Sequence, residues 1–168
     1  MKEINIIDFG LMGKQISALF YLLGYEIGVY NKSKLNIYEF EKQIKLLQRK
    51  IDFSNFNAGK INIYQHIEDL KNSLTIESLN EDLNLKKEIM QILRDNNIVF
   101  SNSSSLSMDD LNCDFIHFFN TIYIKLIELC GSNLERFTPL KDLKKLGFHI
   151  ICSKGNRGAL ANLLLFNE

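Results

Sequence analysis

Two glycines follow the first apolar run of the sequence at a spacing that suits phosphate binding. The run Ile4–Ile7 leads into residues 8–13, which read D-F-G-L-M-G, and a helical pattern begins at once. In a strand–turn–helix of this kind, glycine lets the backbone approach a pyrophosphate, and the first N–H groups of the helix donate to it. Gly10 and Gly13 take the second and third glycine positions of G-x-G-x-x-G. The predicted cofactor contacts of this loop are Asp8, Gly10, Leu11, Met12 and Gly13.

Asp8 stands where that motif has its first glycine. A carboxylate repels a pyrophosphate, and a side chain at this point crowds the turn. Two interpretations follow. Either Asp8 turns aside and caps the helix, or it points at the pyrophosphate position and weakens dinucleotide binding; in the second case Asp8→Gly should tighten binding.

The second predicted strand, Glu26–Tyr30, is followed by a loop that bears on the choice of cofactor. A site for NAD commonly has Asp or Glu after this strand to bind the ribose hydroxyls. Here the position is Asn31, and Lys32 and Lys34 follow it. The lysines would suit the 2′-phosphate of NADP, or they are solvated loop residues, so both NAD and NADP remain candidate cofactors.

Short apolar runs alternate with stretches of helical period along the whole chain. Strands are predicted at 4–7, 26–30, 61–64, 74–76, 98–101, 115–119, 125–129 and 149–152, and helices at 16–23, 35–51, 83–93, 139–146 and 159–166. This alternation predicts an α/β domain with a mostly parallel sheet and helices on both faces. We expect Ile4–Ile7 at the centre of at least six strands, between Glu26–Tyr30 and Ile98–Ser101.

Composition excludes several classes of protein. The 168 residues suit one domain, and the 20 basic and 20 acidic residues cancel, which gives no electrostatic footprint for nucleic acid. No apolar run approaches the length of a membrane helix, and no secretory signal precedes Ile4. The cysteines Cys113, Cys130 and Cys152 lack zinc-like spacing, so no metal site is predicted, and reduced core thiols in a cytoplasmic protein are expected.

Four later segments match a set of motifs in order and at similar spacing. Residues 76–88 are similar to I-E-A-V-x-E-D-L-x-L-K-K-E, and residues 101–107 to S-N-T-S-S-L-S. Residues 115–120 with 125–128 resemble H-F-F-N-P…M-K-L-V-E, and residues 154–165 resemble K-D-x-P-G-F-I-x-N-R-L-L. These motifs are those of the 3-hydroxyacyl-CoA dehydrogenases, which the chain therefore resembles. The resemblance implies a Rossmann-type, doubly wound dinucleotide-binding domain.

The resemblance also implies roles for individual residues. His117 would be the general base that takes the proton of a 3-hydroxyl group, and Glu128 would orient and polarise its imidazole. Imidazole suits this work because it titrates near neutrality and an adjacent carboxylate stabilises its charged form. The residues that match groups around the substrate are Ser104 and Asn162, and those that match cofactor contacts are Glu81, Lys86, Asn102 and Asn120.

A histidine beside three phenylalanines is commonly a core residue without chemistry, so the structural interpretation of His117 stays open at this stage. The sequence also departs from the family pattern. The interval from His117 to Glu128 is one residue short, which we place in the turn at Thr121–Tyr123, and the hairpin after the second strand is cut back. The family continues into a helical domain that closes over the acyl chain, whereas residues 1–168 are expected to form the dinucleotide-binding domain alone.

Three functional hypotheses follow. The first is an NAD(P)-dependent oxidoreductase that transfers hydride between a nicotinamide and a 3-hydroxyacyl or 3-ketoacyl substrate of the acyl-CoA type, in fatty acid metabolism. It would need self-association or a partner chain to complete the pocket. The second is a non-catalytic nucleotide-binding or interaction module derived from the family, and the third is a fragment of a longer enzyme.

Overall fold

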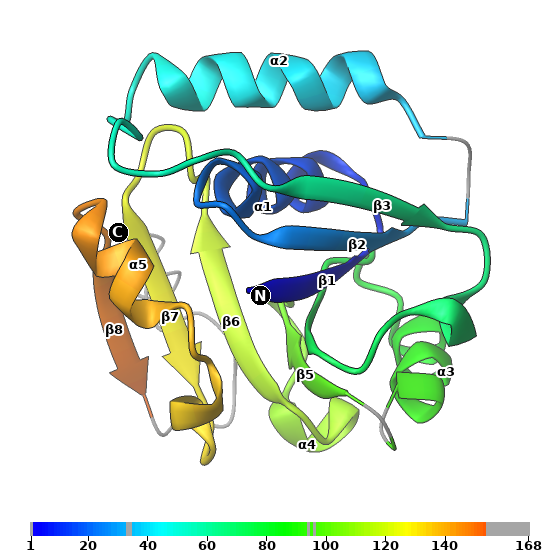
Figure 1. The fold of residues 1–168 in the computed structure, drawn as a ribbon. Coiled ribbons are helices and arrows are strands. Elements are labelled where there is room, and N and C mark those ends of the chain that lie inside the picture. Colours follow the sequence, from blue (N-terminus) through cyan, green and yellow to red (C-terminus); the bar gives the residue numbers. More distant parts are fainter. Residues whose placement is uncertain (1, 33–34, 94, 96, 154–168) are drawn as a thin grey trace.

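The computed structural model describes residues 2–32, 35–93, 95 and 97–153. Within them the chain forms one eight-stranded sheet with helices on both faces (Figure 1). The elements are β1 (Glu3–Ile7), α1 (Leu11–Leu22), β2 (Glu26–Tyr30), α2 (Ile37–Gln48), β3 (Lys60–Tyr64), the 3-10 helix η1 (Ile67–Asp69), β4 (Leu74–Glu77), α3 (Leu83–Leu93), β5 (Ile98–Ser101), α4 (Met108–Leu111), β6 (Asp114–Phe119), β7 (Leu126–Cys130), the 3-10 helix η2 (Leu134–Arg136), α5 (Leu140–Lys145) and β8 (His149–Ser153).

The strand order is β3-β2-β1-β4-β5-β6-β7-β8. All neighbouring strands are parallel except β6 and β7, which form an antiparallel pair. The chain builds outward from β1 to β3 and then returns to β4 on the other side of β1. Such a reversal opens a crevice at the carboxyl ends of the strands, where open α/β sheets bind ligands. The predicted doubly wound, mostly parallel sheet is therefore confirmed.

One detail of the expected order is wrong. The strand beside β1 is β4, not Ile98–Ser101, which lies one position further out as β5. β4 lies next to β1, where Leu74 pairs with Ile4, and all four of its residues are buried. Short buried strands look alike in sequence, and their order depends on which crossover helix covers which face.

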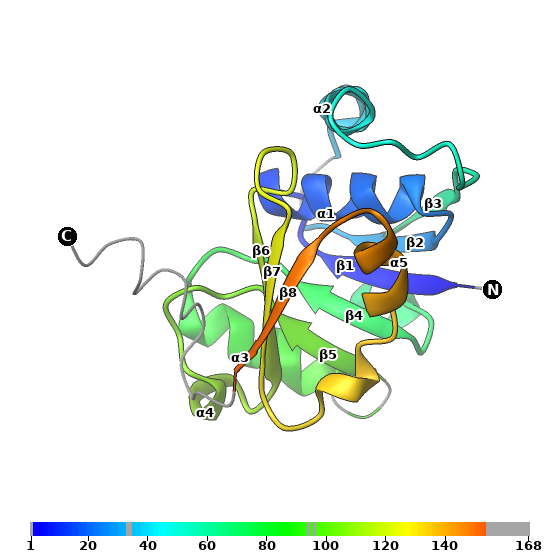
Figure 2. The ribbon, with the colours of Figure 1, turned by 90° about the vertical axis from the view of Figure 1, so that its left-hand side faces the viewer.

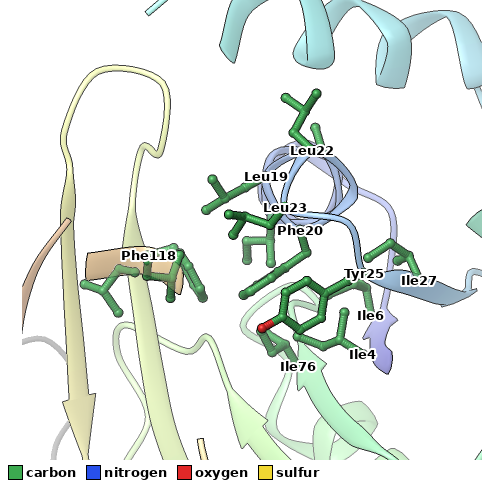
Figure 3. Close-up of a cluster of buried hydrophobic side chains, with 14 of the residues drawn as sticks. Ile4, Ile6, Leu19, Phe20, Leu22, Leu23, Tyr25, Ile27, Ile76 and Phe118 are labelled. Carbon is green, nitrogen blue, oxygen red and sulfur yellow. The ribbon is translucent and has the colours of Figure 1, made fainter. Parts of the chain in front are cut away.

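The two faces of β1 belong to different cores. Ile6 packs in the cluster that holds α1, whereas its neighbour Ile7 packs with Ile89 and Leu93 of α3. Alternation of side chains along a strand produces this division. Figure 3 shows the first cluster, in which Phe20 of α1 lies between Tyr25 and Phe118, with ring centroids 5.1 and 6.1 Å away. α1 is thereby held against both β1 and β6, and α2 packs on the outer side of α1 (Figure 1).

Two local features differ from the sequence expectations. The short helix α4 was not predicted; a capping box between Ser107 and Asp110 starts it. Pro139 is the N-cap of α5 rather than its first helical residue, and Gly147 follows the helix with φ +81°, as a left-handed glycine stop requires. The predicted helix at 159–166 lies outside the described residues.

No helix in the described part of the chain is long and apolar enough to cross a membrane.

Candidate active site

A cleft of about 560 Å³ opens at the carboxyl ends of β1, β4, β5 and β6. This is the crevice that the strand order creates beside β1. Most of the residues that the sequence singled out converge here. The lining residues are Asp8, Gly10, Leu11, Met12, Ser78, Leu79, Asn80, Glu81, Asn102, Ser104, His117, Phe118, Phe119, Asn120 and Ile124.

The glycine loop joins β1 to α1 at one side of this cleft. Gly10 is the N-cap of α1, and no side chain caps the first turn, so its N–H groups remain available to an anion. A Cβ on Gly13 would lie 2.1 Å from the carbonyl oxygen of Asp8, which leaves no room for a side chain. The loop therefore has the tight approach of helix and strand that a pyrophosphate site needs.

Asp8 adopts the left-handed backbone conformation that favours glycine, with φ 74°. Its carboxylate does not cap α1. Instead, Oδ2 accepts a hydrogen bond from the N–H of Gly10 at 3.0 Å, and Asp8 lines the cleft. The hydrogen bond to Gly10 thus fixes a negatively charged carboxylate beside the place where a pyrophosphate would lie.

Asn31 lies at the end of β2 but does not line the cleft. Its Oδ1 accepts from the N–H of Phe9 at 3.0 Å, so the side chain turns back to support the glycine loop. Lys32 is exposed, and Lys34 lies outside the described residues. Of these residues, Asn31 is placed beside the glycine loop and forms a hydrogen bond that supports it.

His117 and Glu128 are directly opposite each other in the antiparallel pair of β6 and β7. Opposite residues in such a pair project from the same face, with Cα atoms about 4.5–5.5 Å apart. The short interval between them is absorbed by the turn after β6, where the N–H groups of Tyr123 and Ile124 both bond to the carbonyl of Asn120. The missing residue therefore does not shift the register, and Glu128 lies on the same face of the sheet as His117.

The imidazole of His117 is largely enclosed and lies edge-on to Phe119, with ring centroids 4.3 Å apart. Burial lowers the pKa of His117 below its ordinary value, while the charges of Glu128 and Glu81 oppose that change. Its Nδ1 is buried and has no hydrogen-bond partner among the described residues. His117 Nδ1 therefore forms no hydrogen bond with Glu128. Glu128 is buried and accepts a hydrogen bond from Ser153 Oγ at 3.3 Å.

Glu81 brings a second carboxylate to the cleft. Ser103 Oγ donates to it at 2.6 Å and the N–H of Ser104 at 2.8 Å. Burial acts to raise the pKa of Glu81, but these bonds and the charge of Lys86 outweigh it and lower the pKa. Glu81 is therefore an ionised group that fixes the serine run, and Ser104 with it, at the cleft.

Two asparagines complete the wall next to His117. Asn102 Oδ1 accepts from the N–H of Phe118 at 2.9 Å, which ties the end of β5 to β6 and leaves the Nδ2 donors of Asn102 for other partners. Asn120 is exposed at the rim, at the start of the turn after β6. Both positions suit contacts to a bound cofactor.

Lys86 is not brought into the cleft. It is fully buried on α3, where Nζ lies 2.6 Å from Glu77 Oε1 and 2.9 Å from the carbonyl oxygen of Leu79. Ser101 Oγ donates to the other oxygen of Glu77 at 2.6 Å. This buried network braces the ends of β4 and β5 beneath the cleft, and Lys86 contributes to the site through it.

Sequence reasoning missed several lining residues. Ser78 is the most consequential, because its hydroxyl donates to the carbonyl of Ile7 at 3.1 Å and approaches that of Asp8 at 3.3 Å. It lies inside the motif at 76–88, so its position after β4 was the available signal. The predicted substrate residue Asn162 lies outside the described residues. No group of three or more His, Cys, Asp or Glu in the described part is placed to hold a metal ion.

A doubly wound sheet, a glycine loop after β1 and a cleft at the strand ends define a Rossmann-type dinucleotide-binding domain. Residues 3–144 match the family described as the NAD binding domain of 3-hydroxyacyl-CoA dehydrogenase, and the chain belongs to this family. NAD is thus the family's cofactor, one of the two that the sequence left open.

Individual relatives agree with this assignment. A 3-hydroxybutyryl-CoA dehydrogenase of Clostridioides difficile is 27% identical over 157 residues, which cover 79% of this chain and 55% of that protein. The chain therefore spans about half the length of this relative. Two solved structures share the fold: FadB2 of M. tuberculosis has a TM-score of 0.76 at 20% identity, over 98% of this chain and 68% of that one. The (S)-3-hydroxybutyryl-CoA dehydrogenase PaaH1 of Ralstonia eutropha has a TM-score of 0.75 at 20% sequence identity, over 98% of this chain and 68% of that one.

Proposed function

We propose that this chain is the NAD-binding part of an oxidoreductase that interconverts a 3-hydroxyacyl and a 3-ketoacyl thioester, with His117 as the general base. The observation that carries the proposal is the pairing of His117 with Glu128 on one face of the sheet, at a cleft that also receives the glycine loop. A bound nicotinamide would supply the hydride acceptor.

The environment of His117 suits proton abstraction. Because burial lowers its pKa, the imidazole is neutral at physiological pH and can accept a proton from a hydroxyl group. The charges of Glu128 and Glu81 would then stabilise the imidazolium that forms. Glu128 acts on His117 from the opposite strand, so we assign it a positioning role rather than contact with substrate.

Other residues would bind and orient. The uncapped first turn of α1 would receive the pyrophosphate, and Gly10 and Gly13 would allow its approach. Ser104, held by Glu81, and Asn102 and Asn120 lie where they could contact a substrate carbonyl or the nicotinamide. Asn162 is proposed as a further substrate contact from the sequence motif alone.

The pocket for the acyl chain would need another surface. Leu11, Tyr123 and Ile124 are exposed at 63, 70 and 44%, and Leu11 and Ile124 line the cleft. A second copy of the chain or a separate helical chain would cover this apolar rim. A comparison of oligomeric state with and without NADH, by light scattering, tests the self-association arm.

One observation favours the second candidate function, a nucleotide-binding module without catalysis. The Asp8 carboxylate accepts a hydrogen bond from the N–H of Gly10, in the loop where a pyrophosphate would bind. If it excludes the dinucleotide, the His117–Glu128 pair has no cofactor to serve.

Titration with NADH and with NADPH, followed by nicotinamide fluorescence, is the first test. Saturable NADH binding together with oxidation of NADH by acetoacetyl-CoA supports the enzyme, and its loss in His117→Gln assigns the base. NADH binding without turnover, in the presence of any partner that the chain co-purifies with, favours the module. Absence of binding to either dinucleotide, in the native chain and in Asp8→Gly, overturns both.

A further inference from the structure

A second cavity, of about 590 Å³, lies at the opposite end of the sheet from the cleft. Its floor is formed at the amino ends of β1, β4 and β5, by Glu3, Leu74 and Ile98. Its wall is formed by residues of η2 and α5. Figure 2 shows α5 beside the start of β1. The volume lies in the range of small-molecule sites, and no residue is shared with the carboxyl-end cleft.

The lining of this amino-end cavity is rich in cations. Lys2, Arg136, Lys141 and Lys145 contribute positive charge, against the two carboxylates Glu3 and Asp142. The chain as a whole has a formal net charge of +0, so this excess is local.

Both carboxylates already have partners. Asp142 is buried and accepts from Lys2 Nζ at 2.6 Å and from the hydroxyl of Tyr25 at 2.9 Å. Glu3 lies 3.2 Å from the ammonium of Lys71, outside the lining. Asp142 therefore ties α5 to Lys2 and Tyr25, and Glu3 is paired with Lys71. Neither carboxylate is free to neutralise the remaining cations.

Two of the cations are unpaired. Within the described residues, Arg136 and Lys141 form no salt bridge and no side-chain hydrogen bond, and Lys145 reaches Asp142 only at 4.0 Å. Their charges come from neighbouring elements, η2 and α5, and converge on one cavity. A multiply charged anion between them would be bound by both.

The neutral lining completes the chemistry. Asn72, Ser73 and Thr138 offer amide and hydroxyl donors, while Leu74, Ile98 and the ring of Tyr25 offer apolar contact. Guanidinium recognises phosphate through two parallel hydrogen bonds, and lysine adds a point charge. We propose that the amino-end cavity binds a phosphate-bearing small molecule, with Arg136 and Lys141 as its principal cationic contacts. This site is independent of the proposed dehydrogenase function.

Calorimetric titration of the full chain in chloride buffer tests the proposal, with inorganic phosphate, pyrophosphate and ADP as probes. We expect saturable binding of at least one probe and a loss of at least tenfold in affinity in the double variant Arg136→Gln/Lys141→Gln. Lys144→Gln is the matched control, because Lys144 is an exposed lysine of the same helix that does not line the cavity. Its affinity should match that of the native chain.

Amide chemical shifts then locate the probe. Shifts at residues 136–145 support the proposal, and preference for ADP over phosphate and pyrophosphate identifies a nucleotide as the class of ligand. Shifts confined to residues 8–13, equal losses in the Lys144→Gln control, or no saturable binding of any probe to the folded chain would overturn it. Because NADH binding at residues 8–13 is measured separately, failure here leaves the dehydrogenase proposal intact.

Discussion

The two ends of the sheet differ in the groups that they offer to an anion. The carboxyl-end cleft is lined by the carboxylates Asp8 and Glu81 and by no lysine or arginine among the described residues. The amino-end cavity is lined by Lys2, Arg136, Lys141 and Lys145. The cleft must therefore attract phosphate through backbone N–H groups and the dipole of α1, whereas the cavity offers side-chain charge.

The difference predicts how each end responds to its surroundings. Exposed side-chain charges are screened by salt, so binding at the amino end should weaken as ionic strength rises. Backbone N–H groups carry no titratable charge, and the fold fixes their positions. Binding at the cleft therefore depends on the conformation of the glycine loop and of the strands beneath it. Single changes should therefore act more severely at the carboxyl end.

The largest expected effect is on turnover. His117→Gln removes the proposed base at the carboxyl end, and the rate of NADH oxidation with a 3-ketoacyl thioester should fall by about 10²–10⁴-fold, the usual contribution of a positioned base. His66→Gln is the control, because His66 is exposed and does not line the cleft. Retention of most of the activity in His117→Gln, measured by absorbance, would remove the catalytic role.

The next effect is on stability. Lys86→Met leaves the buried carboxylate of Glu77 without its ion-pair partner, and the free energy of unfolding should fall by about 3–5 kcal/mol. Lys87→Met changes an exposed neighbour on the same helix and should alter stability by less than about 0.5 kcal/mol. Urea unfolding measures both, and equal effects would show that the pair does not brace the cleft.

A smaller effect concerns Asp8. Asp8→Gly removes a charge and frees the N–H of Gly10, so NADH affinity should increase by roughly tenfold. Stability should change by less than about 1 kcal/mol, because relief of the left-handed conformation offsets the greater freedom of glycine in the unfolded chain. Asp8→Asn separates charge from backbone conformation, and it should give most of the gain. Equal or weaker binding in both variants would mean that Asp8 does not oppose the dinucleotide.

The smallest effect is a shift in titration. NMR should give His117 a pKa below the ordinary value of about 6.5, and Glu128→Gln should lower it further because a stabilising negative charge is lost. Since the unfolded chain binds the proton more readily, the stability due to neutral His117 is present above about pH 6.5 and declines as pH falls towards the lowered pKa. His117→Gln should remove this acid dependence. A pKa that rises in Glu128→Gln would contradict the proposed coupling.

Much of the fold could be predicted from the sequence because its signals are local. The period of α1, the glycine at its start and the apolar run of β1 all depend on residues close together in the chain. The neighbour of β1 could not be predicted in this way. β4 and β5 are both short and buried, and the choice between them depends on crossovers that join distant segments.

The candidate site likewise has features that could be predicted from local sequence and features that could not. The types of residue at the glycine loop, the serine run and the His117 strand could be recognised from motifs, and the structure gathers them at one cleft. The burial of Lys86 against Glu77 could not be predicted, because an ammonium group suits a bound anion or a buried carboxylate equally well. Only the arrangement of α3 over β4 places Glu77 beside it.

The sequence by itself determined the alternation of strands and helices, the tight turn with Gly10 and Gly13 and the membership of the family, since these follow from periodicity and from short ordered motifs. Tertiary structure alone decided that Glu128 lies opposite His117, that Asp8 bonds to Gly10, and that Arg136 and Lys141 line one cavity at the amino ends of the strands. The reason is physical: strand register, loop conformation and the position of α5, which Asp142 ties to Lys2 and Tyr25, are set by contacts between residues far apart in the chain.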